Sequence, residues 1–182
     1  MRVLESERVV VKPIEREDLS FLLELRWDKD IMNYLIHDPI SMESQEAWFE
    51  KTSKSNDMPC SIFVKGDGDP SELTIAGTVG LYNFNHRHQR ATWRVRLSSD
   101  FQGKGLAFEA IMMVLDYGFN TLNLNKIVSD SFADNTAIIK LSQKLGFSEE
   151  GVVRSHYFHQ GRFRDGINFG LLREDFNAKF GG

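Results

Sequence analysis

The sequence predicts a mixed α/β fold in which one central sheet carries helices on both of its faces. Residues 90–97 alternate apolar and polar side chains, as a strand with one buried face does. Residues 105–119 instead repeat apolar side chains at the spacing of a helix. Other strand and helix patterns precede and follow these two segments. A chain of 182 residues is long enough for one such domain.

The first part of the chain predicts a strand followed by two helices. Residues 8–13 are rich in β-branched side chains and end at a proline, which is typical of a strand. Residues 15–27 carry leucines and Trp27 at helical spacing. A second helix is expected to begin at Ser41, which with Ser44 forms a weak version of the capping box.

The middle of the chain predicts a meander of three strands. Their patterns cover residues 60–65, 74–82 and 90–97. Residues 66–71 are rich in glycine, aspartate and proline and form a turn between the first two strands. A polar connection over residues 83–89 leads to the third strand.

The rest of the chain alternates helix and strand. The expected elements are a helix over 105–119, a strand over 126–132, a helix over 134–145 and strands over 147–154 and 163–172. Asp134 can cap the start of the second helix, and Gly146 suits the left-handed residue after its end. The last two strands are joined by a turn at Gln160 and Gly161.

Composition and charge exclude several classes of function. The net charge of −4 does not suit a general nucleic-acid binder. Neither a signal sequence nor an apolar run of membrane-spanning length is present, so we expect a cytoplasmic protein that does not bind membranes. Cys60, the one cysteine, lies in a predicted strand and is expected to be a packing residue, and no spacing of Cys and His is typical of a metal site.

The segment 101–107, which reads FQGKGLA, joins a predicted strand to a predicted helix. Gly103 and Gly105 allow the backbone to approach a bulky anion, and the first amides of the helix are unpaired. Together with the charge of Lys104, these features favour a phosphate or pyrophosphate site. A plain turn between strand and helix explains the glycines equally well at this point.

The helix over 134–145 supplies a second motif. Asn135 is followed eleven residues later by Gly146 and Phe147, and Ser142 is expected on the same helix face as Asn135, two turns further on. Lys140 and Lys144 lie one turn apart near the carboxyl end, where the helix dipole favours cations.

The two motifs together resemble the GNAT superfamily of acetyl-CoA-dependent N-acetyltransferases. The form Gln/Arg-x-x-Gly-x-Gly/Ala of its cofactor loop is similar to residues 102–107, and its next helix is introduced by Asn and closed by Gly-Phe. The N-terminal VVVKPIEREDL (residues 9–19) also resembles its opening strand and helix. The resemblance covers about residues 8–175, which implies one catalytic domain over residues 1–182. Within the superfamily, spermidine N-acetyltransferases are most similar, followed by ribosomal-protein N-terminal acetyltransferases.

The resemblance implies a mostly antiparallel sheet whose central strands splay apart to hold acetyl-CoA, with no metal. The backbone at 95–97 would line the pantetheine, the amides of 103–108 would bind the pyrophosphate, and Asn135 would contact the pantetheine arm. The cofactor-binding residues expected on this basis are Val95, Arg96, Leu97, Gln102, Gly103, Lys104, Gly105, Leu106, Ala107, Phe108, Asn135 and Lys144.

The resemblance also implies transfer of the acetyl group to a primary amine by direct attack. A polyamine such as spermidine is the favoured acceptor, although Thr92 stands where the spermidine enzymes tend to carry an acidic residue. A protein N-terminus is the alternative acceptor, a catalytically weak CoA-binding relative is the alternative function, and the resemblance allows a homo-oligomer.

Candidates for proton transfer and acceptor binding are few. Ser142 stands where many family members have the tyrosine that protonates the leaving thiolate, so Ser142 or a water is the candidate acid. His37 has a suitable intrinsic pKa for the base. Asp38 and Glu43 are the candidates for binding the acceptor. The alternative to a chemical role for His37 is a position in a surface loop. The alternative for Glu43 and Glu46 is a solvent-exposed helix face.

Overall fold

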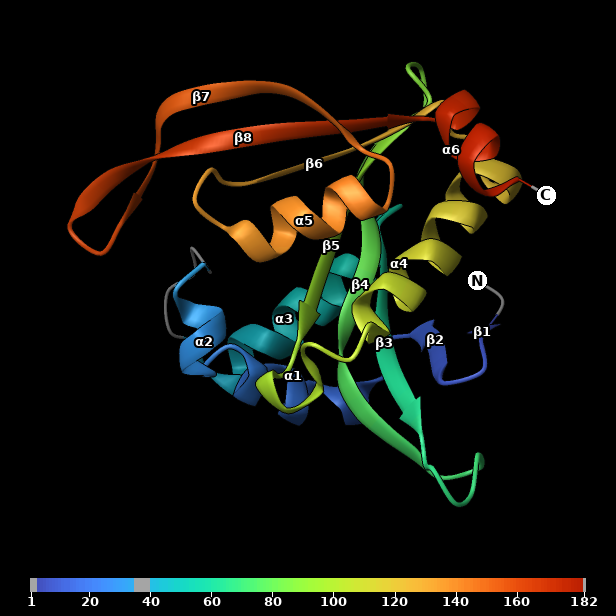
Figure 1. The fold of residues 1–182 in the computed structure, drawn as a ribbon. Helices are drawn as coiled ribbons and strands as arrows, with labels where there is room; N and C mark the ends of the chain where they lie inside the picture. Colours follow the sequence, from blue (N-terminus) through green and yellow to red (C-terminus); the bar gives the residue numbers. More distant parts are fainter. Residues whose placement is uncertain (1–2, 35–39, 182) are drawn as a thin grey trace.

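The computed structural model describes residues 3–34 and 40–181, which form one mixed sheet with helices on both faces (Figure 1). The sheet order is β1-β2-β3-β4-β5-β6-β8-β7. The strands are β1 Leu4–Glu5, β2 Val9–Pro13, β3 Met58–Lys65, β4 Leu73–Asn85, β5 Arg90–Leu97, β6 Lys126–Phe132, β7 Ser148–His159 and β8 Arg162–Leu172. All neighbouring pairs are antiparallel except β5 and β6, which are parallel. The predicted fold class is therefore confirmed.

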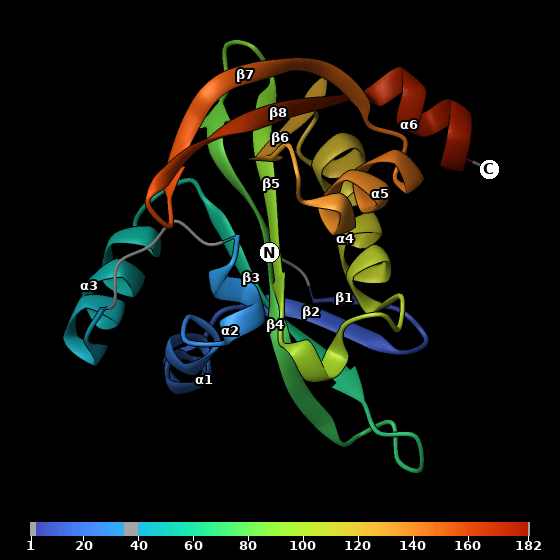
Figure 2. The same ribbon diagram turned by 60° about the vertical axis from the view of Figure 1, so that its left-hand side comes forward.

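The helices form a layer on each face of the sheet. They are α1 Leu19–Leu25, α2 Lys29–Met32, α3 Met42–Thr52, α4 Leu106–Asp116, α5 Thr136–Lys144 and α6 Arg173–Phe180, with short 3-10 turns η1 Arg16–Asp18 and η2 Ser99–Phe101. Figure 2 shows α1, α2 and α3 on one side of the central strands and α4 and α5 on the other. The sheet thus separates the two helical layers (Figure 2).

The main core lies between the sheet and α4. Ile111 and Leu115 of α4 are fully buried, together with Val9 of β2 and Leu81 of β4. The helix continues into a wider π-helical turn, η3 Tyr117–Thr121, that packs tightly on the sheet. A Cβ atom at Gly118 would lie 2.9 Å from Leu81 Cδ1, so any larger residue would have to displace this side chain. This packing fixes the position of α4 and of the loop that precedes it.

The sheet opens between its two parallel strands. β5 and β6 pair only from Arg90 to Thr92 with Lys126 to Val128. Beyond Thr92, β5 remains paired with β4, and β6 remains paired with β8. Figure 1 shows β5 and β6 running apart, with α5 beside the point of divergence. The splayed central strands that the resemblance implied are present.

Several predicted elements differ from the structure at their ends. β5 and β6 have the predicted bounds, and Ser41 caps α3 by accepting a hydrogen bond from the Ser44 amide. The first helix ends at Leu25 rather than at Trp27, whose side chain is 58% exposed. The strands β7 and β8 are longer than predicted, while β1, α2 and α6 were not predicted.

The start of α5 corrects the predicted cap. Asn135, not Asp134, is the N-cap, and its side-chain oxygen accepts a hydrogen bond from the Ile138 amide over 3.3 Å. Asp134 is instead ion-paired with Arg164 of β8. Within the described part of the chain, no helix is long and apolar enough to cross a membrane.

Candidate functional site

A cleft of about 1030 Å³ lies where β5 and β6 separate. One wall is formed by the loop before α4, by α4 itself and by α5. The opposite wall contains Asn33 and Tyr34, which follow α2, and Tyr157 of β7. The cleft therefore connects the two helical layers through the opening in the sheet.

The loop before α4 exposes unpaired amides to the cleft. Gly103 and Gly105 have φ angles of +73° and +80°, a region that favours glycine. A Cβ atom at Gly103 would meet no atom within 4 Å, so its glycine serves the backbone conformation and not packing. Across residues 3–34 and 40–181, no acceptor takes the amides of residues 103–108. The open space and free donors suit a phosphate group.

An ion pair from the N-terminal segment supports this loop. Arg8 Nε donates to Glu109 Oε1 over 2.7 Å, and Arg8 Nη1 donates to the Lys104 carbonyl over 3.1 Å. Ser6 Oγ donates to Glu109 Oε2 over 3.0 Å. Because Glu109 lies in the first turn of α4, its charge would otherwise repel an anion at this end of the helix. Arg8 and Glu109 are far apart in sequence, and no local pattern predicts their contact.

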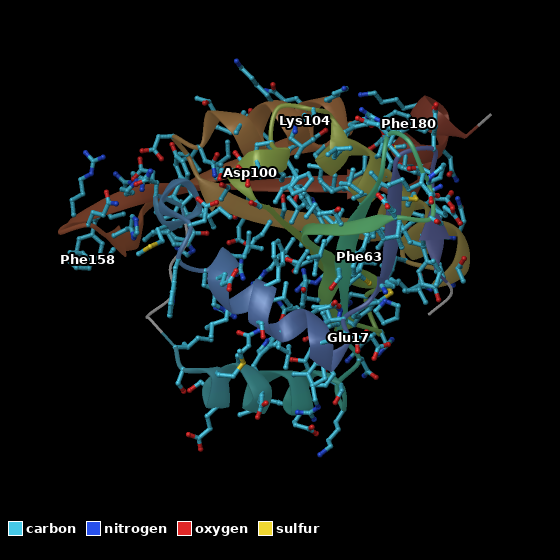
Figure 3. The ribbon with its side chains drawn as sticks, turned by 90° about the horizontal axis from the view of Figure 1, so that it is seen from below. Glu17, Phe63, Asp100, Lys104, Phe158 and Phe180 are labelled. Atoms are coloured by element: carbon cyan, nitrogen blue, oxygen red, sulfur yellow. The ribbon has the colours of Figure 1, made fainter. Side chains whose placement is uncertain are left out.

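The predicted loop residues differ in what their side chains do. Gln102 Nε2 donates to the Leu97 carbonyl over 2.9 Å, so this side chain fixes the end of β5. Leu106, Ala107 and Phe108 line the cleft beside the two glycines. The Lys104 ammonium lies 5.5 Å from the centre of the Phe101 ring, and its side chain is not part of the cleft wall. Figure 3 labels Lys104 and Asp100 on this segment, while Phe158 lies at the far end of the β7–β8 hairpin.

Helix α5 contributes one polar and two basic residues to the cleft. Asn135 is 7% exposed and lines the cleft while it caps the helix. Lys140 and Lys144 also line it. The Lys144 ammonium lies 4.3 Å from the centre of the Phe108 ring. The expected residues Val95, Arg96 and Leu97 of β5 line the same cleft, so most of the predicted cofactor set is brought together.

Of the candidate acid and acceptor-binding residues, the two that the structure describes, Ser142 and Glu43, do not line the cleft. Ser142 is fully buried and does not line it. The prediction placed Ser142 on the face of Asn135, and both side chains are buried, but only Asn135 lines the cleft. Glu43 and Glu46 are exposed on α3 and do not line the cleft. His37 and Asp38 lie outside the described residues.

Two residues that sequence reasoning missed form a polar pair in the cleft. Tyr157 Oη donates to Asp130 Oδ2 over 2.5 Å, and both residues line the cleft. Burial, and then the hydrogen bond to Asp130, raise the pKa of the Tyr157 hydroxyl. Asp130 is the one acidic residue among the described residues that line the cleft. The predicted strand ended at residue 154, before Tyr157, so no local pattern pointed to this pair.

The strand β5 brings two arginines to the same region. Arg94 and Arg96 line the cleft, and the Arg94 guanidinium lies 5.6 Å from the centre of the Tyr82 ring. Burial, followed by the nearby charge of Arg26, lowers the pKa of Arg96 to about 10. Burial also raises the pKa of Tyr82 to about 12. Strand β5 therefore contributes two guanidinium groups to the lining of the cleft.

The described residues contain no group of three His, Cys, Asp or Glu side chains that could hold a metal ion. Cys60 is fully buried in β3, as predicted, and burial raises the pKa of its thiol to about 12. The polar groups that line the cleft are amides, cations, serine hydroxyls, one carboxylate and the phenols of Tyr34 and Tyr157.

Comparison with known proteins gives one family. Residues 8–148 match the model of the acetyltransferase (GNAT) domain. The spermidine N(1)-acetyltransferase of Escherichia coli (strain K12) is 31% identical over 176 residues, which are 96% of this chain and 91% of that protein. A less similar relative, a putative ribosomal N-acetyltransferase of Bacillus subtilis (strain 168), is 24% identical and covers 96% of both chains.

The fold matches a solved relative over nearly its whole length. The crystal structure of spermidine N-acetyltransferase from Vibrio cholerae in complex with CoA and spermine has a TM-score of 0.84 and 27% sequence identity. The match covers 94% of this chain and 99% of that one.

Proposed function

Because the chain belongs to the GNAT acetyltransferase family and is an acetyl-CoA-dependent N-acetyltransferase, we propose that it acetylates a small primary amine by direct attack on the thioester. The observation that carries the proposal is the cleft through the sheet. Free amides of the loop before α4 line it, and so does a carboxylate that is hydrogen-bonded to a phenol. Donor and acceptor can then meet from opposite faces. One sheet with one main core further supports a single catalytic domain.

The loop and α5 are assigned to the donor. Acetyl-CoA supplies the thioester carbonyl that the amine attacks. The amides of residues 103–108 and the positive end of the α4 dipole suit its pyrophosphate. The exposed ammonium groups of Lys140 and Lys144 add positive charge along α5. Gln102 holds the Leu97 carbonyl and so positions the β5 backbone beside the cofactor arm.

Asp130 is assigned to the acceptor. Its carboxylate attracts an ammonium group, and the Tyr157 hydroxyl holds one of its oxygens in place. The attacking amine must be neutral. An amine with a pKa near 8 is neutral in about one molecule in ten at pH 7, but one near 10.4 in only about one in a few thousand. A carboxylate is a weak base for deprotonating an amine whose pKa is near 10.4. An amine whose pKa is near 8 therefore suits this site better.

The departing thiolate is proposed to leave without a side-chain acid. Ser142 is buried away from the cleft, and the Tyr157 proton is shared with Asp130. A thiol of pKa near 8.5 is a tolerable leaving group in its ionised form. As the carbon–sulfur bond breaks, the attacking nitrogen releases one proton to solvent, and the thiolate is protonated by solvent after it has left.

Polyamines are the first acceptors to test, because relatives from Escherichia coli and Vibrio cholerae carry the name of spermidine acetyltransferases. Thiol release from acetyl-CoA should be followed with spermidine, spermine, monoamines, amino acids and short peptides. The peptides test the alternative of a protein N-terminus. Release with at least one small amine is expected. Release only with peptides, or none above hydrolysis with any amine, would refute the proposed acceptor class.

A further inference from the structure

One side chain that lies outside the cleft contacts two parts of the cleft wall. Arg164 of β8 does not line the cleft, and its side chain is only 10% exposed. Its Nη1 donates to the Asn33 carbonyl over 3.2 Å. The guanidinium carbon lies 5.3 Å from the centre of the Tyr34 ring and 4.0 Å from that of the Phe132 ring. All three partners line the cleft, so Arg164 joins the segment after α2 to the end of β6.

The guanidinium of Arg164 is itself held in a fixed orientation. Its Nε donates to Asp134 Oδ2 over 3.2 Å, and its Nη2 donates to the other oxygen of the same carboxylate. A pair of parallel hydrogen bonds fixes the plane of an arginine as well as its position. Asp134 is 54% exposed, does not line the cleft and directly precedes Asn135, the cap of α5. Arg164 therefore ties the segment after α2 to the start of α5, and these two helices belong to opposite layers (Figure 2).

The contacts of Arg164 continue to the carboxylate proposed for the acceptor. The ring centre of Phe132 lies 4.7 Å from that of Tyr157 and 6.1 Å from that of Tyr34. The Tyr157 hydroxyl donates to Asp130 over 2.5 Å. We call Tyr34, Phe132 and Tyr157 the aromatic wall. Arg164 packs on two of its three rings, and the third holds the carboxylate.

We propose that Arg164 is a positioning residue, which keeps the aromatic wall beside Asp130 in the arrangement that admits the amine. The inference rests on the proposed function of this cleft. Tyr34 is 43% exposed and α2 has only four residues, so this segment has little packing or helical structure of its own to hold it. The hydrogen bond from Arg164 and a longer one from Gln160 Nε2 to Asn33 Oδ1, 3.4 Å, supply long-range contacts instead.

Loss of this guanidinium should affect the amine more than acetyl-CoA. A displacement of about 1 Å in a positioned group can lower a rate by about a hundredfold, so we expect at least a tenfold loss for the amine. The contacts of Arg164 given above do not include the loop of residues 103–108. Asn135 keeps its own hydrogen bond from the Ile138 amide. The donor side of the cleft should therefore remain intact.

The test compares Arg164→Gln with Arg162→Gln, which makes the same change of charge at an exposed position on the same face of β8. Thiol release gives kcat and KM for spermidine, or for the amine of the panel above with the highest kcat/KM. In Arg164→Gln this kcat/KM should fall at least tenfold, mainly through a higher KM. The dissociation constant of acetyl-CoA, measured by calorimetry, should stay within twofold. Arg162→Gln should change neither value more than twofold.

Two further variants identify the contacts that matter. Arg164→Lys keeps the positive charge but loses the planar fork, so it should resemble Arg164→Gln. Asp134→Ala removes the carboxylate that orients the guanidinium and should raise KM for the amine about threefold, although Asp134 lies outside the cleft. Combined with Arg164→Gln, it should cause no further loss, because the two residues act through one contact. If Arg164→Gln does not fold, Asp134→Ala takes its place in every measurement.

Hydrogen exchange reports on the segment after α2 without any amine. The Tyr34 amide donates to the Ile31 carbonyl over 3.0 Å. Deuterium uptake by peptides that cover residues 28–34 should be at least threefold faster in Arg164→Gln than in Arg162→Gln, while uptake by α4 should be unchanged. If no amine releases thiol, the proposed function fails, and this measurement still tests what Arg164 holds in place.

Four results would overturn the inference. They are unchanged exchange over residues 28–34 in Arg164→Gln, a KM for the amine within twofold of the unmodified protein, full activity of Arg164→Lys, or an equal loss of affinity for the amine and for acetyl-CoA. The last result would indicate a general structural role. A fall in kcat with both affinities unchanged, as partial unfolding produces, would likewise count against positioning.

Discussion

Replacing Arg8 by glutamine tests whether the loop before α4 is a phosphate site. The side chains of Arg8 and Glu109 are 49% and 24% exposed, so their ion pair contributes little to stability. The variant leaves the Glu109 carboxylate without its counter-charge in the first turn of α4. Two unit charges about 8 Å apart interact by about 1 kcal/mol at an effective dielectric constant of about 40.

A pyrophosphate carries about two charges, so the expected loss is about 2 kcal/mol, or about thirtyfold in the dissociation constant of acetyl-CoA. Calorimetry at low salt measures this dissociation constant. The difference between the variant and the unmodified protein should be smaller at high salt because the charges are screened. The double variant with Glu109→Gln should bind nearly as tightly as the unmodified protein.

The double variant also decides between two causes. If it binds as weakly as Arg8→Gln alone, the loss comes from the missing hydrogen bond to the Lys104 carbonyl and not from charge. If Arg8→Gln binds acetyl-CoA with unchanged affinity, the reasoning that places phosphate beside Glu109 is refuted.

Four further predictions concern single positions. Gly105→Val should weaken acetyl-CoA binding more than tenfold because valine is strained at a φ of +80°, whereas Gly68→Val in an open turn should not; equal affinities in folded proteins would show that the loop is only a turn. Ser142→Ala should leave kcat within twofold and raise stability by up to about 1 kcal/mol, since the serine hydroxyl has no hydrogen-bond partner in the described structure; a large fall in kcat would restore Ser142 as the acid. Asp130→Asn should lower kcat/KM for the best amine at least tenfold in steady-state assays, and a change below twofold contradicts its role. Cys60 should resist thiol reagents at pH 8 until the protein unfolds, since its pKa is about 12; rapid labelling of the native protein would contradict its burial.

The sequence predicted those parts of the site that depend on local patterns. Alternating side chains located β5, and its bounds of Arg90–Leu97 are those observed. The glycines at 103 and 105 indicated a loop whose backbone a bulky anion could approach, and both have positive φ angles in the structure. Both signals come from neighbouring residues, whose conformation depends mainly on their own side chains.

Contacts between distant segments could not be predicted in this way. Asp130 meets Tyr157 only because β6 and β7 both pair with β8. Ser142 is fully buried and does not line the cleft, although Asn135, seven residues earlier, does. Such errors arise where the pairing of distant strands or the cap of a helix determines where a side chain lies. A single sequence does not show which distant residues pair or which residue forms the cap.

The short pairing between β5 and β6 divides the molecule into two stretches of continuous chain. Strands β1 to β5 come from the first 97 residues, and β6, β7 and β8 come from residues 126–172. Each stretch forms its own hydrogen-bonded ladder, and three residue pairs join them. Two neighbouring units of this kind can open with different free energies. A molecule bound along the junction contacts both, so acetyl-CoA would make their unfolding more cooperative as well as supply the acetyl group.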